Sequence, residues 1–450
     1  MELADAAALV LERARAHAGV EAEAIAAEAD RLEVGVRLGK PEKLKRSRER
    51  RLALRIFAGH SSAVVSTADL SASSLESLVG DAVDLARATA ADPSSGLADL
   101  DGQSSPSFEL DLFDPSATEI TADEALGLAR VAEEAALACD PRLSNSEGAE
   151  FSSAARRLLY ATSRGFRGEQ RSSSFSLSVV PVAKEANGDG SMQRDYWYTS
   201  ARHRRDLDDA ADVGRIAAAR TLRRLGARSV TTCDVPVVFE AEIAASLVGH
   251  IASAVSGSAV YRGMSYLRDR QGQTIAPETV RVVDDPLRSA GLASRPFDAE
   301  GLTSRTNVVV DGGVLRTFLL DTYSARKLGL ASTASAVRSL GEPPVAGATN
   351  LYLEAGSASR EEIIGSVGSG LYVTELIGSG VNPVTGDYSR GAAGLWIENG
   401  KLAFPVEGIT IAGNVLEMLA AIEAVGNDLA FRSSISAPTV KIARMTVAGR

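Results

Sequence analysis

Cysteine and histidine are scarce in this chain of 450 residues, which holds two cysteines and four histidines. Two cysteines are too few for a disulfide framework in a chain of this length, so the sequence predicts a protein of a reducing compartment, the cytoplasm. We expect Cys139 and Cys233 to be small buried hydrophobic side chains. The four histidines are scattered rather than grouped at metal-ligand spacing, so we expect no metal site made by this chain alone.

Long apolar runs and a positive net charge are also missing. No stretch of about 18 uncharged apolar residues occurs, and no basic region precedes an apolar segment at the start, so we expect neither a membrane span nor a signal peptide. The net charge of -10 disfavours nucleic acid as a partner. One basic run at 40–51 (KPEKLKRSRERR) departs from this, but Glu42 and Glu49 interrupt it, which favours a solvated hairpin over a nucleic-acid patch.

Several common catalytic motifs do not occur. The chain has no G-x-x-x-x-G-K-[ST] phosphate loop, no strand-borne G-x-G-x-x-G, no C-x-x-C pair and no G-x-S-x-G elbow. Nucleotide-dependent chemistry and the chemistry of the α/β-hydrolases are therefore unsupported.

The first half of the chain mixes helical and alternating patterns. Apolar residues at helical spacing predict helices over 3–17, after Ser73, and over 121–139; Ser73 with Glu76 and Thr121 with Glu124 have the spacing of a capping box. Alternating segments predict antiparallel strands, and a polar stretch at 185–194 predicts a hairpin tip. The predicted strands lie at 21–29, 32–38, 52–58, 62–67, 175–183 and 196–201.

An amphipathic helix at 207–225 ends near Gly226, and we place a domain boundary at 226–234. The second half is rich in glycine and short strands, with Asn399-Gly400 as a type I′ hairpin signal and helical stretches at 241–255 and 413–425. The predicted class is α+β. It consists of an N-terminal domain (1–226) of mixed sheet flanked by helices, followed by a β-rich C-terminal domain (227–450) with two helical segments.

His250 is the histidine with the clearest chemical context, because it lies in a mostly apolar helix with Ser246 one turn earlier on the same face. This spacing permits a Ser–His hydrogen bond and hence a nucleophilic dyad. The alternative is ordinary helix packing, which is the more frequent role of such a histidine.

The glycine-rich segment 376–394 (LIGSGVNPVTGDYSRGAAG) is the densest turn signal. Glycines let a backbone approach a ligand closely, so the segment could be a binding loop, and a long hairpin connection explains the same residues. The candidates for peptide contact are Gly378, Gly380, Asn382 and Arg390.

Three long segments resemble the TldD/PmbA family, in the family's own order along nearly the whole chain. They are LEVGVRLGKPEKLKRSRERRLALRIFAGHSSAVVST, LIGSGVNPVTGDYSRGAAGLWIENGKLAFPVEGITIAGN and GNDLAFRSSISAPTVKIARMTVAG. The resemblance implies one of two branches. The TldD branch carries a zinc-binding H-E-x-x-x-H helix and a later cysteine ligand, and the TldE/PmbA branch lacks both.

In this chain the corresponding helix reads Ala245, Ser246, Leu-Val-Gly and His250, so only the last histidine is kept. After Asn427-Asp428-Leu429 the chain runs AFRSSISAP with no cysteine. A catalytic zinc ordinarily needs three protein ligands, and such a peptidase uses the motif glutamate as its base. The resemblance therefore places this chain in the TldE/PmbA branch, with no metal and no catalytic residues of its own.

What the resemblance implies is a heterodimer with a TldD-type subunit that holds the zinc, acting on short unfolded peptides in the cytoplasm. The resemblance is also compatible with a homodimer of the isolated chain. Two alternatives stay open: a stand-alone peptidase with a noncanonical site near His250, and a regulatory binding protein that acts on a topoisomerase-type partner, suggested by the family's link to DNA gyrase.

Overall fold

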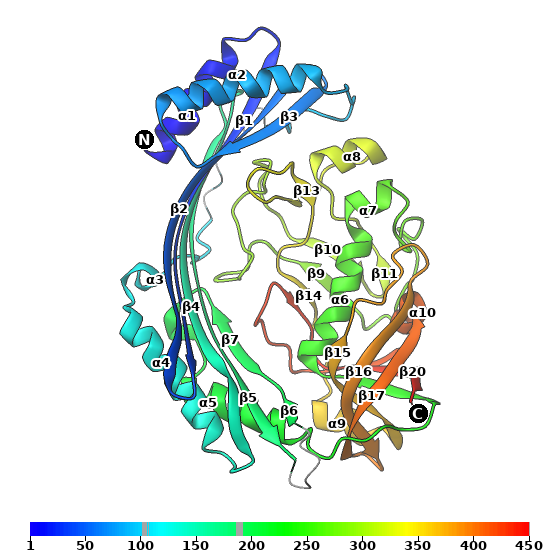
Figure 1. Ribbon diagram of the computed structural model, residues 1–450. Coiled ribbons are helices and arrows are strands. Elements are labelled where there is room, and N and C mark those ends of the chain that lie inside the picture. The colour runs from blue at the N-terminus through cyan, green and yellow to red at the C-terminus, as the bar shows by residue number, and fades with distance from the viewer. Residues whose placement is uncertain (101–105, 107, 186–191, 450) are drawn as a thin grey trace.

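The N-terminal half is built on one long antiparallel sheet with the order β3-β2-β1-β4-β5-β6 and with β7 also paired to β5 (Figure 1). The computed structural model describes residues 1–100, 106, 108–185 and 192–449. The elements of this half are α1 (Leu3–Arg15), β1 (Val20–Arg37), β2 (Lys40–Ala58), β3 (Ser61–Thr67), α2 (Ala72–Ala88), α3 (Ser116–Glu119), α4 (Ala122–Leu137), β4 (Leu143–Thr162), β5 (Arg167–Lys184), β6 (Met192–Arg194), β7 (Trp197–Ala201), a 3₁₀ turn (Arg204–Asp206) and α5 (Ala210–Leu222).

The helices of this half cover the convex face of the sheet in two separate groups. Strands of 18 to 20 residues are long enough for one face to carry two apolar cores, because successive side chains alternate between faces. At one end α1 and α2 pack on residues such as Ala24 and Leu54. At the other end α4 and α5 pack on residues such as Val34 and Phe175.

The C-terminal half contains a closed sheet in which β17, β16, β15, β8 and β20 follow one another and β17 pairs back to β20. Parallel pairs occur here, between β8 and β15 and between β14 and β19. The elements are β8 (Cys233–Phe239), α6 (Ala241–Val255), α7 (Gly257–Tyr261), β9 (Val282–Asp284), β10 (Asn307–Asp311), β11 (Val314–Leu315), α8 (Thr322–Leu328), β12 (Ala336–Val337), β13 (Val345–Ala346), β14 (Leu351–Leu353), α9 (Arg360–Gly365), β15 (Ser369–Ile377), β16 (Asp387–Glu398), β17 (Lys401–Asn414), α10 (Val415–Ala420), β18 (Ile422–Val425), β19 (Ile435–Ser436) and β20 (Val440–Ala448).

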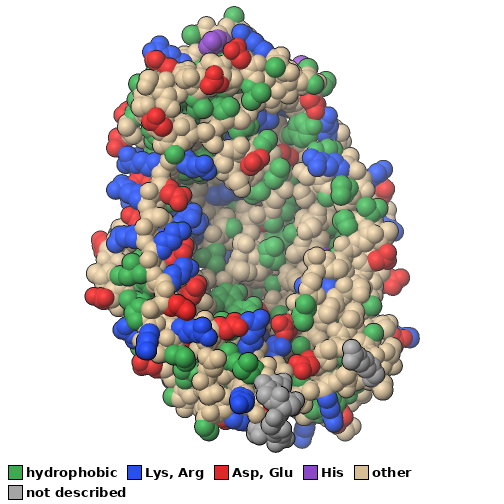
Figure 2. Space-filling model, viewed as in Figure 1, with side chains coloured by type: hydrophobic (Ala, Val, Ile, Leu, Met, Phe, Trp, Pro, Cys, Tyr) green, Lys and Arg blue, Asp and Glu red, His purple; other side chains and the backbone are tan. Residues whose placement is uncertain are grey.

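The long sheet curves around the C-terminal half, and Figure 2 shows a hollow between the two. A buried ionic group joins them at one end of the sheet. The Arg338 guanidinium donates to the Glu23 carboxylate at 2.7 Å, Arg55 lies 3.8 Å from the same carboxylate, and the Tyr160 hydroxyl donates to it at 2.7 Å. These contacts, made by three sheet strands and one C-terminal segment, fix one rim of the hollow.

The α+β class is confirmed, and so are two local signals. Thr121 and Glu124 form the predicted capping box at the start of α4. Asn399 and Gly400 have φ values of 50° and 74°, as a type I′ turn between β16 and β17 requires.

Four details of the sequence prediction are wrong. The helix α2 begins at Ala72 after Ser71, so Ser73 does not cap it, and Glu76 instead pairs with Arg13 at 2.7 Å. The helix predicted at 413–425 ends at Ala420, because 422–425 forms β18 and pairs with β20. Cys139 is exposed and Cys233 is half-buried, so neither is a buried core residue.

Two further outcomes concern the hairpin tip and the membrane. Residues 186–191 of the predicted tip at 185–194 lie outside the described residues. Within the part of the chain that the structure describes, no helix combines the length and the apolar character that crossing a bilayer requires.

Candidate functional site

Helix α6 follows β8 directly and carries the residues singled out in the sequence. Its alanine-rich sequence favours a helix, and its buried side chains recur at spacings of three and four residues. Leu247, Val248 and Ile251 belong to the main C-terminal core. This packing fixes the rotation of α6 and thereby the directions of Ala245, Ser246 and His250.

Two residues of β16, Tyr388 and Arg390, lie close to His250. The rings of His250 and Tyr388 meet edge to face with their centroids 5.8 Å apart, and the Nε2 atom is buried without a hydrogen-bond partner among the described residues. Burial, and secondarily the positive charge of Arg390, lowers the pKa of His250 to about 4. The imidazole is therefore neutral at pH 7 and packed against a ring, with a cation as its charged neighbour.

Ser246 has its hydrogen bond inside the helix. Its hydroxyl donates to the Ile243 carbonyl at 2.7 Å, which is a common local bond for serine in a helix. The sequence interpretation of a Ser246–His250 dyad has no hydrogen bond to support it among the described residues, and the alternative of ordinary helix packing accounts for both side chains.

Ala245 lines a small cavity of about 30 Å³ where α6 meets the segment 430–437 and Tyr198 of β7. Its acidic group is Glu242, whose pKa is raised by burial and by the nearby charge of Glu240. A guanidinium nitrogen of Arg432 lies 4.0 Å from the Glu242 carboxylate. A carboxylate whose charged form is disfavoured, beside an arginine and an alanine, does not fit a zinc ion, which needs deprotonated ligands.

Among the described residues, no group of three or more histidine, cysteine, aspartate or glutamate side chains is arranged to hold a metal ion.

The glycine-rich segment 376–394 contains the end of β15, a hairpin connection at 378–386 and the first part of β16. Gly378 has a φ of 77°. The Gly380 carbonyl accepts a hydrogen bond from the Ser389 amide, and the two backbones are so close that a side chain at Gly380 would collide with the Ser389 carbonyl oxygen. The Asn382 side chain accepts from two amides of its own turn. Arg390 lies apart from them, on β16 beside His250. Peptide contact by these four residues stays a prediction.

Arg390 and Tyr388 were the residues of this site that the sequence interpretation did not group with His250. They are two positions apart on β16, so both point to one face of the sheet. This alternation was visible in the sequence, but the pairing of that face with α6 required the fold.

Family models cover most of the chain. Residues 22–86, 115–225 and 232–449 match domain 1, the central domain and the C-terminal domain of the PmbA/TldA metallopeptidases. "Metalloprotease PmbA" of Escherichia coli O157:H7 is 39% identical over 93% of this chain and 90% of that protein. The chain belongs to the PmbA/TldD family. Within the family it falls in the PmbA branch.

One further relative and two solved structures are similar to this chain. The "Metalloprotease PmbA homolog" of Haemophilus influenzae is 34% identical over 100% of this chain and 96% of that protein. A solved structure from Bacteroides thetaiotaomicron, described as a candidate modulator of DNA gyrase, is 27% identical and has a TM-score of 0.91 over 99% of both chains. TldE from Thermococcus kodakarensis shares the fold, with a TM-score of 0.85 at 20% identity over 95% of this chain and 97% of that one.

Proposed function

We propose that this chain is the non-catalytic subunit of a heterodimeric metallopeptidase of the TldD/TldE type, which degrades or processes short unfolded peptides in the cytoplasm. A TldD-type partner supplies the zinc and the catalytic base. This chain supplies binding surface and helps to enclose the peptide.

The proposal rests on the side chains that α6 presents at positions 245, 246 and 250. Where an active member of the family has a histidine and a glutamate, this chain has Ala245 beside a cavity of about 30 Å³ and Ser246 bonded to its own helix. His250 is neutral, covered by Tyr388 and next to the cation of Arg390. A hydrolytic zinc would have one imidazole to bind it and no carboxylate to activate its water.

A role in enclosing a peptide is supported by the concave face of the long sheet. Phe175 and Leu177 of β5 point into the core beneath α4 and α5, so the alternating Ser172, Ser174 and Ser176 point to the opposite, concave face. These serines are half-buried and uncharged. Such a row of small hydroxyl side chains can accept a peptide backbone without selecting a particular side chain, as peptide binding by main-chain contacts requires.

Reconstitution tests the proposal. The purified full-length chain is mixed with a TldD-type subunit, and cleavage of an unstructured fluorogenic peptide is compared for each protein alone and for the mixture. We expect cleavage by the mixture, sensitive to a chelator, and none by this chain alone. The matched control replaces the glutamate of the partner's H-E-x-x-x-H motif, which should abolish cleavage, whereas Ser246→Ala in this chain should not. Chelator-sensitive cleavage by this chain alone would contradict the proposal and support a site near His250.

A further inference from the structure

Strand β2 has a long free edge. Strand β3 pairs only with Leu52–Ala58, so residues 40–51 pair with β1 on one side and with no described strand on the other. Nearly all of these residues are exposed, including Leu44 at 61%. Twelve residues of extended chain span about 40 Å and present alternate backbone N–H and C=O groups to a strand that could be added.

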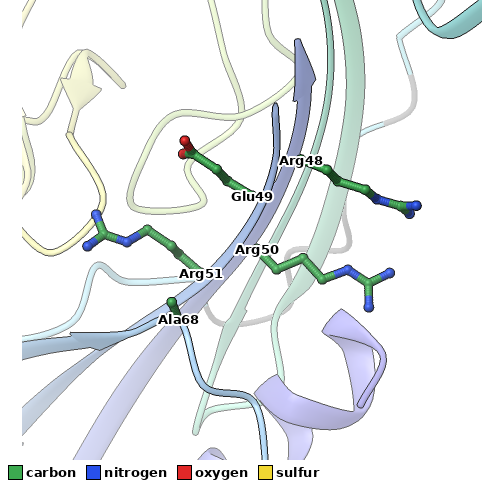
Figure 3. A pocket seen from close by; sticks show the side chains of 5 residues that line it. All are labelled: Arg48, Glu49, Arg50, Arg51 and Ala68. Atoms are coloured by element: carbon green, nitrogen blue, oxygen red, sulfur yellow. The ribbon is translucent and has the colours of Figure 1, made fainter. Parts of the chain in front are cut away.

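An open pocket lies beside this edge, at the point where β3 ends. Strand β3 ends at Thr67, and the pocket of about 890 Å³ is lined by Ala68 and by 48–51 of β2. Figure 3 shows Arg48 and Arg50 on one side of the strand and Glu49 and Arg51 on the other. A continuation of β3 would occupy this space, so a further strand can lie there without displacing any described element.

The edge carries positive charge on both faces. Residues 40–51 hold seven basic and two acidic side chains in a protein whose net charge is -10. Carboxylates of β1 pair with part of this charge, since Glu28 bonds Arg48 and Arg50, and Asp30 lies 3.6 Å from Arg46. Within the described residues, Lys40, Lys45 and Arg51 have no carboxylate within 4.0 Å, whereas Arg50 has Glu28 and Glu2. Lys43 also pairs with Glu33 and Glu150, so the positive charge outside ion pairs is concentrated at the two ends of the edge and at Lys45, which lies opposite Glu33 on β1.

This charge pattern favours an acidic strand over a second copy of the chain. In a two-fold antiparallel pair the residue at the axis lies opposite its own counterpart, so pairing at the centre of the edge places Lys45 opposite Lys45 or Arg46 opposite Arg46. Like charges directly opposite each other are destabilising in a sheet. A strand with carboxylates at these positions places opposite charges there instead.

We infer that the free edge of β2 at 40–51 binds an extended acidic segment of another polypeptide as an added strand. Backbone hydrogen bonds hold the segment, and its carboxylates lie opposite Lys45 and Arg51 on the concave face. The inference does not depend on which subunit holds zinc.

The test uses the full-length chain and a labelled twelve-residue peptide of alternating threonine and glutamate, with a threonine–lysine peptide as the opposite probe. We expect the acidic peptide to bind, the basic one not to bind, and the affinity to fall as salt is added. Hydrogen exchange of backbone amides in 40–51 should slow on binding. The variant Lys45→Glu/Arg51→Glu should weaken binding ~10-fold, since two cross-strand attractions become repulsions.

The matched control is Arg87→Glu/Lys401→Glu, which makes the same change of net charge at exposed positions on α2 and β17, and it should bind as the wild type does. Equal binding by the Lys45→Glu/Arg51→Glu variant, protection of amides outside 40–51, or no binding of the acidic peptide would overturn the inference. So would a single-stranded oligonucleotide that displaces the peptide at lower concentration than the unlabelled peptide itself, because the edge would then be a nucleic-acid surface.

Discussion

Replacing His250 with phenylalanine should make the folded chain less sensitive to acid. In the wild type, burial and Arg390 lower the pKa of His250 to about 4 in the folded state, whereas an exposed histidine has a pKa of about 6.5. Because the unfolded chain binds this proton more readily, the wild type loses stability as the pH falls from about 6.5 toward 4.

The size of the effect follows from these two values. At about pH 5 the loss due to His250 is at most about 2 kcal/mol, and partial exposure of the ring to water reduces it to about 1–2 kcal/mol. At neutral pH the variant should gain about 1 kcal/mol, because the buried Nε2 without a partner is removed while the edge-to-face contact with Tyr388 is kept.

The assay is urea unfolding of both proteins near pH 7.5 and near pH 5. Other titrating groups are common to both proteins and cancel when the two pH-dependent differences are compared. The variant Tyr388→Phe keeps the ring above His250 and should retain the acid sensitivity of the wild type. Equal acid sensitivity in wild type and His250→Phe would refute the description of His250 as a neutral, covered side chain.

Three further predictions concern stability elsewhere. Burial and two neighbouring carboxylates raise the pKa of Glu300 to about 8, so the wild type should lose thermal stability as the pH rises from about 5 to about 9, and Glu300→Gln should lose less over the same melting series. Gly214→Ala should cost at least about 2 kcal/mol in urea unfolding, because the new methyl group would lie 2.2 Å from a carbonyl of α4, whereas Gly127→Ala, with open space around it, should gain about 0.5–1 kcal/mol. Arg338→Met should cost about 3–5 kcal/mol in the same assay by leaving Glu23 buried without its main partner, and adding Glu23→Gln should recover most of the loss.

Local signals in the sequence predicted much of the fold. Capping at Thr121–Glu124 and the turn at Asn399–Gly400 are decided by residues within one turn of each other, so neighbouring residues were enough. The serine at position 73 shows the limit of such signals, because Ser71 offers a start to the same helix two residues earlier. The helix predicted through 425 failed because pairing of 422–425 with β20 outweighs local helix propensity.

The candidate site also has one part that the sequence predicted and another that only the fold shows. The loss of metal ligands at Ala245 and Ser246 is readable from the residues, because it depends on side-chain chemistry alone. The contact of His250 with Tyr388 and the nearby charge of Arg390 bring together segments about 140 residues apart in the chain, and no periodicity within either segment encodes this. The link from Glu23 to Arg338 likewise arises only when the sheet lies against the C-terminal half, and the free edge of β2 arises because β3 pairs only with Leu52–Ala58.

Zinc content measured by mass spectrometry, on the isolated full-length chain and on its complex with a TldD-type subunit, tests the account most directly. After exposure to zinc and removal of the excess, the isolated chain should retain almost none, and the complex should retain the amount that the partner holds by itself. Near-stoichiometric zinc on the isolated chain, lost when His250 is replaced, would contradict the account.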